Sequence, residues 1–173
     1  MASRYNMALA GWLLAGLLLP ALLWAGDAKE PSARVAATLD ALHAYAAEAD
    51  FERYFALYSP AAVFLGTDAS ERWSVEEFKN YARPVFASGR GWTYTVVQRW
   101  ITVSMDGNTA WFDEVLDNAS LGSCRGSGVL VRSGDDWLIT QYNLTIPIPN
   151  DLADEFAARI QEFEAAGQDA GSD

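Results

Sequence analysis

The sequence has little cysteine, histidine or basic charge, and each shortage argues against a class of structure or partner. Among its 173 residues there is one cysteine, Cys124, and one histidine, His43. A lone cysteine cannot form a disulfide within the chain, and a lone histidine cannot supply a histidine-based zinc site. Only 12 lysines and arginines stand against 23 aspartates and glutamates, which gives a formal net charge of −11. Nucleic acids and anionic membrane surfaces attract basic proteins, so we expect neither as a partner.

The N-terminus carries a long apolar run with the features of an export signal. Arg4 precedes an apolar segment from Met7 to Trp24, and the small residues of Ala25-Gly26-Asp27-Ala28 follow it. We therefore expect residues 1–28 to be a cleaved signal peptide and the protein to be exported, periplasmic or secreted. An uncleaved membrane anchor is the alternative, because roughly 18 apolar residues approach the length that spans a bilayer.

The rest of the chain is long enough for one domain with its own core. We place that domain at residues 29–166 and a flexible polar tail at 167–173. The single thiol, Cys124, is interpreted as a structural residue. A nucleophilic cysteine needs a histidine or another cation beside it, and Arg125 is the only cationic residue close to Cys124 in the sequence.

Periodicity and turn signals divide the domain into helices followed by strands. Apolar spacing and caps, including a capping box of Ser74 with Glu77, predict helices at 31–49, 50–59, 74–87 and 150–165 and a short strand at 62–65. Four segments dense in β-branched and aromatic residues, 92–104, 109–118, 124–132 and 137–148, predict two hairpins. The fold class is therefore α+β: three N-terminal helices cover a strongly curved, mostly antiparallel sheet in a cone-shaped, barrel-like fold, and a C-terminal helix follows.

The first hairpin is expected to carry an ion pair on its inner face. Pairing around Asp106-Gly107 places Arg99 opposite Glu114 on a face that also holds Val97. Two charges among apolar side chains must pair to be tolerated there. The pair either fixes the floor of a cavity, or Arg99 binds a substrate anion while Glu114 acts as a base.

The second hairpin allows two registers. A three-residue turn places Arg125 on the same face as Gln141 and Asn143, whereas a two-residue turn places Gly126 and Gly128 opposite Asn143 and Gln141. We favour the first register because it gathers the polar groups on one face. Trp73 is one of several aromatic residues that we expect to line either an apolar pocket or a dimer interface. The candidate ligand-binding residues are Arg99, Glu114, Arg125, Gln141, Asn143 and Trp73.

Three carboxylates are the candidate catalytic residues. Asp68 and Glu71 lie on a loop over the expected mouth of the cone, where burial or mutual repulsion raises a carboxyl pKa, and Glu114 is the third. The alternative for the loop is a solvated Asx turn. His43, one residue off the apolar stripe of the first helix, is interpreted as a partly buried polar residue, with a role as ligand or base as the alternative. No nucleophilic triad, phosphate loop or dinucleotide motif is present, so any catalysis is expected to use neither cofactor nor metal.

The order of several segments resembles the nuclear transport factor 2-like superfamily, and within it the SnoaL-like exported bacterial proteins. These segments are Phe64-Leu-Gly-Thr-Asp68 with Glu71 and Trp73, Trp111-Phe-Asp-Glu114, Arg125-Gly-Ser-Gly-Val-Leu130, and Trp137-Leu-Ile-Thr-Gln-Tyr-Asn-Leu144 ending in Ile146-Pro-Ile-Pro-Asn150. The resemblance implies a cone with an interior cavity, often paired into a homodimer through the outer sheet face. The superfamily includes isomerases, cyclases, dehydratases and proteins that only bind, so it does not name one function.

Three functions therefore stay open. The first is binding of a small, partly apolar molecule in the cavity. The second is a cofactor-free isomerase, dehydratase or cyclase that uses a cavity carboxylate as base. The third is a structural homodimer whose cavity is filled by its own side chains. An enzyme needs an open mouth and at least one carboxylate with a raised pKa that is reachable from it. A binding protein needs only the open cavity, and a scaffold needs neither.

Overall fold

The structure is a computed structural model that describes residues 29–170. Its elements are α1 (Lys29–Ala47), α2 (Phe51–Ala56), β1 (Tyr58–Leu65), β2 (Arg72–Ser74), α3 (Val75–Ala87), β3 (Thr95–Val103), β4 (Thr109–Asn118), β5 (Gly122–Ser133), β6 (Asp136–Thr145), the short 3-10 helix η1 (Asn150–Leu152) and α4 (Ala153–Ala170). The predicted signal peptide lies outside the described residues. Within them, no helix has both the length and the apolar character needed to cross a bilayer.

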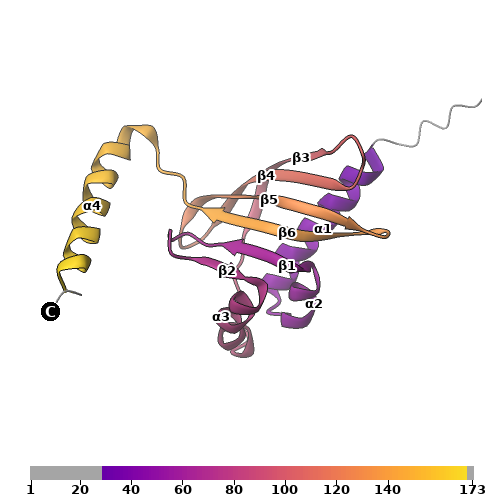
Figure 1. Ribbon diagram of the computed structural model, residues 1–173, viewed down its shortest axis with the longest axis horizontal. Helices are drawn as coiled ribbons and strands as arrows, with labels where there is room; N and C mark the ends of the chain where they lie inside the picture. The colour runs from indigo at the N-terminus through magenta and orange to yellow at the C-terminus, as the bar shows by residue number, and fades with distance from the viewer. Residues whose placement is uncertain (1–28, 171–173) are drawn as a thin grey trace, which may run out of the picture.

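The six strands form one curved, open sheet in the order β2-β1-β6-β5-β4-β3. Every neighbouring pair is antiparallel except β1 with β6, which is parallel. The helices α1, α2 and α3 pack on the sheet, as Figure 1 shows. The predicted α+β architecture of three N-terminal helices, a curved sheet and a C-terminal helix is confirmed.

Local signals explain where the N-terminal helices begin and which side they bury. The Asp50 side chain accepts a hydrogen bond from the Arg53 backbone N–H and caps α2, while Ser74 and Glu77 form the predicted capping box of α3. The apolar stripe of α1 is almost fully buried: Val35, Leu39, Leu42 and Ala46. These residues recur at helical spacing, so one face of α1 covers the sheet.

One prediction for the inner face of the sheet is wrong because β3 contains a bulge. Val97 was expected beside Arg99, but its side chain is 66% exposed. The register shifts between Val96 and Gln98, so that Val96 instead pairs with the buried Leu116 of β4. An extra residue in one strand reverses the alternation of side chains beyond it, and an alternation pattern alone cannot locate such a residue.

The second hairpin combines features of both predicted registers. Its turn has two residues, because Ser133 pairs with Asp136, and Gly134 between them has a φ of 64°. A bulge in β6 between Ile139 and Gln141 then shifts the register. As a result Gln141 lies opposite Val129. It shares a face with Arg125 and Asn143, as was predicted for the three-residue turn. The polar residues are gathered on one face, but that face is the outer one.

The C-terminal helix extends away from the sheet rather than covering it (Figure 1). It continues to Ala170, beyond the predicted end near residue 165. A stripe of large apolar side chains along this segment is exposed: Leu152, Phe156, Ile160 and Phe163. Because these side chains bury little surface, α4 contributes little to the core of the domain.

Candidate functional site

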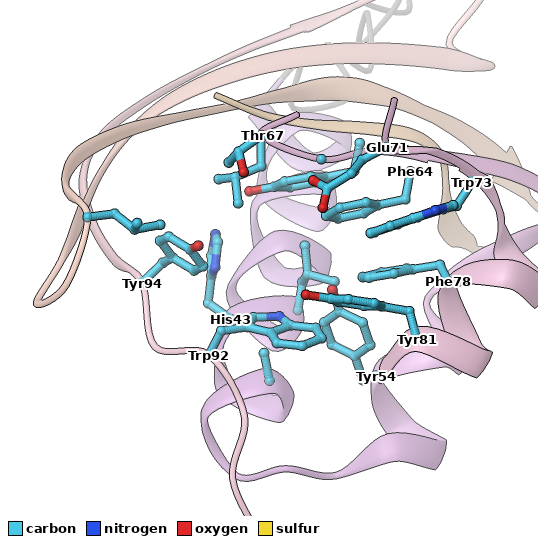
Figure 2. A pocket seen from close by; sticks show the side chains of 16 residues that line it. His43, Tyr54, Phe64, Thr67, Glu71, Trp73, Phe78, Tyr81, Trp92 and Tyr94 are labelled. Carbon is cyan, nitrogen blue, oxygen red and sulfur yellow. The ribbon is translucent and has the colours of Figure 1, made fainter. Parts of the chain in front are cut away.

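A cavity of about 200 Å³ lies between the helices and the inner face of the sheet. Half of the residues that line it are phenylalanine, tyrosine or tryptophan, as the close view in Figure 2 shows. The rings come from α2, β1, β2, α3, the segment before β3, and β6: Tyr54, Phe64, Trp73, Phe78, Tyr81, Trp92, Tyr94 and Tyr142. The polar lining side chains, apart from the tyrosines, are His43, Thr67 and Glu71. A volume below the roughly 300–1,000 Å³ of drug-sized sites restricts the occupant to a small molecule.

Several rings beside the cavity share nearly one orientation, whereas Tyr54 lies at 67° to Phe78 and 79° to Trp92. The planes of Phe64 and Tyr142 differ by 5°, those of Trp73 and Phe78 by 10°, and those of Phe78 and Trp92 by 22°. Phe64 and Phe78 stack with their centroids 3.9 Å apart. Parallel rings give the cavity flat, apolar sides, which suit a flat, apolar part of a ligand.

Behind one wall of the cavity, Glu114 is the centre of a buried hydrogen-bond network. Its Oε1 accepts from Nε2 of His43 at 2.8 Å and from the hydroxyl of Tyr142 at 3.1 Å. Its Oε2 accepts from Nε of Arg99 at 2.7 Å. The predicted pair of Arg99 and Glu114 is therefore present, and Arg99 continues outward to Asp40 through Nη1 at 2.6 Å.

The network sets the protonation state of its members. Burial disfavours the charged form of Glu114, but His43 and Arg99 outweigh it, so the pKa of Glu114 lies below the ordinary value of 4.5. Burial raises the pKa of Tyr142 well above its usual range, and the charge of Glu114 adds to this effect. Glu114 is thus an ionised acceptor, and Tyr142 is a neutral donor.

His43 connects this network to the cavity. Glu114 offers only acceptor oxygens, so Nε2 of His43 must carry the hydrogen between them. The other ring nitrogen, Nδ1, has no hydrogen-bond partner among residues 29–170. In the neutral imidazole Nδ1 is therefore a proton acceptor at the cavity wall, and the hydrogen bond to Glu114 orients the ring.

A glycine in β5 makes room for the network. A Cβ at Gly126, which pairs with Glu114 across the strands, would collide with the Tyr142 hydroxyl and lie 2.8 Å from Oε1 of Glu114. Any larger residue would displace the carboxylate or the phenol. Gly126 thus provides the space in which these two side chains meet.

The structure brings some predicted site residues to the cavity and places others elsewhere. Glu71 and Trp73 line the cavity, and Glu114 with Arg99 lies directly behind His43. Asp68 is exposed and bonds to Ser70, and this bonding holds its pKa below the ordinary value, so it matches the alternative of a solvated turn.

Three predicted ligand-binding residues lie on the other face of the sheet. Arg125 pairs with Val115, one residue away from the inward-facing Glu114, and Gln141 and Asn143 share the outer face with Arg125. Inward positions alternate along each strand, so a cluster on the outer face cannot line this cavity. Cys124 is buried on the inner face, and burial, with the nearby Asp117, raises the pKa of its thiol.

The contact of His43 with Glu114 was not predicted, although the sequence held a signal for it. Ala36, Asp40 and His43 recur at intervals of four and three residues, so they share one face of α1. In the structure Arg99 reaches that face, where Nη1 also bonds to the Ala36 carbonyl at 3.3 Å. A polar strip on an otherwise buried helix indicates polar partners on the opposing sheet. No group of three histidine, cysteine, aspartate or glutamate side chains within residues 29–170 is placed to hold a metal ion.

Comparisons with known proteins agree with this architecture. The family described as the SnoaL-like domain matches residues 35–149. A candidate dehydratase of the NTF2-like family from Streptomyces avermitilis is 13% identical, with a TM-score of 0.60 over 70% of this chain and 99% of that one. An NTF2-like protein of unknown function from Pseudomonas putida is 10% identical, with a TM-score of 0.57 over 69% and 89%. A cystatin-like fold protein from Burkholderia xenovorans is 18% identical, with a TM-score of 0.59 over 71% and 97%. No curated protein matches the chain.

Proposed function

Because the chain belongs to the SnoaL-like domain family, we propose that it binds a small, partly apolar molecule in its aromatic cavity. The observation that carries this proposal is a cavity of about 200 Å³ with polar groups at separate points of an aromatic wall. Ligand sites typically combine such an apolar lining with a few polar groups that fix the orientation of the ligand. A scaffold filled by its own side chains would not need this space.

Identification of a bound molecule tests the proposal directly. Native mass spectrometry of the full chain, purified gently from its own cells, should show a small molecule at one per chain. Leu42 is buried at the cavity wall, so Leu42→Trp should fill the space and reduce occupancy at least tenfold. The matched control is Leu152→Trp, at an exposed position outside the cavity, which should leave occupancy unchanged. An empty wild-type protein whose cavity also rejects a panel of small apolar probes would contradict the proposal.

Acid–base catalysis without a cofactor is the second candidate, favoured by the 2.8 Å hydrogen bond between His43 and Glu114. The base in this reaction is His43 rather than a carboxylate, because Glu114 is buried behind it and already accepts three hydrogen bonds. Nδ1 of His43 takes a proton from the bound molecule, and Glu114 stabilises the imidazolium that forms. This chemistry suits an isomerase, a dehydratase or a cyclase.

Exchange of an acidic C–H with solvent deuterium tests this second candidate. Phenylacetone carries such a hydrogen beside a single ring, and the protein should accelerate its exchange as followed by nuclear magnetic resonance. A well-placed general base contributes about 10²–10⁴-fold, so His43→Ala should slow the catalysed exchange by at least that lower factor. Asp68→Asn, in the exposed loop, is the control and should leave the rate unchanged. Equal rates for His43→Ala and the wild type would exclude His43 as the base.

We further propose that the protein acts outside the cytoplasm as a homodimer. The N-terminal sequence supports export. Two exposed tryptophans on the outer sheet face, Trp100 and Trp111, support pairing, since aromatic residues are enriched at interfaces. The structural homodimer remains an alternative function for the same surface, and it requires no ligand.

A further inference from the structure

The formal charge among the described residues that line the cavity is negative and comes from Glu71. Among the described residues that line it there is no lysine or arginine. Arg99, behind Glu114, directs Nε to that carboxylate and Nη1 to Asp40. Its charge is therefore compensated within the network and is not offered to the cavity. A ligand carboxylate or phosphate would find no cationic partner there.

Glu71 places a carboxylate at the cavity from the loop between β1 and β2. Its Oε2 accepts from the backbone N–H of Asp68 at 3.2 Å, and the side chain lies over Gly66, where a Cβ would collide with it. Its other oxygen, Oε1, has no hydrogen-bond partner in residues 29–170. Figure 2 shows this carboxylate beside the ring of Phe64, directed toward the space that the aromatic side chains surround. A negative acceptor is thus available to a ligand.

His43 adds a second acceptor on another wall of the same cavity. Its Nε2 hydrogen is committed to Glu114, so a neutral His43 can offer only the lone pair of Nδ1. A ligand that carries N–H donors satisfies both groups, whereas a ligand that carries only acceptors satisfies neither. A positive charge gains further from Glu71 and from the surrounding aromatic rings.

The aromatic lining selects the shape of the apolar part. Rings whose planes agree within 5° to 22° along Tyr142, Phe64, Phe78 and Trp92 favour a flat group placed parallel to them. A saturated ring of the same size lacks the aromatic face and edge that interact favourably with these rings.

We propose that the cavity takes a small cationic aromatic amine, with its ring parallel to the aromatic lining and its ammonium group on Glu71. This inference rests on the proposed binding function and specifies the charge and shape of the ligand. The net charge of −11 would also concentrate cations near the surface, so the test must separate that general attraction from the cavity.

Four probes of nearly equal size separate charge from shape when titrated calorimetrically into the full chain. They are phenethylamine, 2-phenylethanol, phenylacetate and 2-cyclohexylethylamine. Phenethylamine should bind at one site per chain and at least ten times more tightly than 2-phenylethanol. Phenylacetate should not bind measurably, and 2-cyclohexylethylamine should bind several times more weakly than phenethylamine.

Two loop variants assign the charge preference to one carboxylate. Glu71→Gln should lower the affinity for phenethylamine to that for 2-phenylethanol. Asp68→Asn removes one charge from the same loop outside the cavity, so it should preserve the preference. Equal or tighter binding of 2-phenylethanol or phenylacetate by the wild type would overturn this inference while leaving the proposed binding function intact. Failure of all four probes to bind would overturn this inference, whereas the proposed binding function falls only if the protein is also purified without a bound molecule. An amine preference that survives Glu71→Gln would overturn the role of Glu71.

Discussion

Replacing Glu114 by leucine is expected to lower the free energy of unfolding by about 3–5 kcal/mol, the usual cost of removing one partner from a buried ion pair. The Glu114 side chain is 0% exposed, and it accepts from His43, Tyr142 and Arg99. Leucine would leave these three donors without their acceptor in a place that water does not easily reach. The loss of their partners, rather than the change in volume, dominates the effect.

Urea-induced unfolding measures this effect, and the neighbouring residue gives the control. Asp113 lies next to Glu114 on the outer face of β4 and is exposed. Asp113→Leu removes a carboxylate of the same strand, yet it should change the free energy of unfolding by no more than about 0.5 kcal/mol. Glu114→Gln keeps the shape and part of the hydrogen bonding, so its effect should fall between the two. Equal effects of Glu114→Leu and Asp113→Leu would refute the network as a source of stability.

The same network predicts a loss of stability in acid. The pKa of Glu114 is lower in the folded protein than its ordinary value of 4.5, so the unfolded chain binds this proton more readily. The contribution is therefore complete above pH 4.5 and decreases as the pH falls through the lower folded pKa. In the Glu114→Leu variant this part of the acid dependence should be absent.

The parts of the fold that local chemistry determines could be predicted from the sequence. Ser74 and Glu77 form their capping box within one helical turn, and Arg99 meets Glu114 because a tight turn fixes the register near it. In both cases the partners are close in the sequence or are aligned by a nearby turn. Neither depends on how distant elements pack.

The parts that depend on distant packing could not be predicted. The bulges beside Val97 in β3 and after Ile139 in β6 each change which residues face inward. Arg125 was assigned to the cavity because it shares a face with Gln141, and nothing in a single hairpin tells which face the helices will cover. His43 lies 71 residues from Glu114, so its role became apparent only when α1 was placed on β4.

The aromatic cavity and the buried network are connected through two side chains that belong to both. His43 and Tyr142 both line the cavity, and both donate to Glu114 behind it. Ordering of these two side chains therefore comes from a charge that lies behind the cavity wall. Hydrogen bonds from a residue outside a binding site can hold the polar groups of the site in place before a ligand binds. A substitution at Glu114 should then weaken binding through the orientation of His43, without any change to the aromatic lining.

Phe78 is the second position where a large effect is expected: Phe78→Ala should cost about 3–5 kcal/mol of unfolding free energy, as is typical of buried phenylalanines. The side chain is 1% exposed and stacks on Phe64 at 3.9 Å between ring centroids. It also lies 5.9 Å from the rings of Trp73 and Trp92. Removal of this ring takes away a shared neighbour of the parallel aromatic side chains and leaves an apolar void beside the aromatic cavity.

Phe163 in α4 provides the matched control, since its side chain is 80% exposed. Phe163→Ala deletes the same atoms where they are already in water, so the free energy of unfolding should change by no more than about 0.5 kcal/mol. Thermal unfolding in the presence of benzene adds a second readout, because an apolar void of this kind can be refilled by a small apolar molecule. Benzene should raise the melting temperature of Phe78→Ala more than that of the wild type. Equal costs for the two alanine variants would mean that the aromatic lining does not stabilise the domain, and the absence of any added effect of benzene would mean that the core closes over the missing ring.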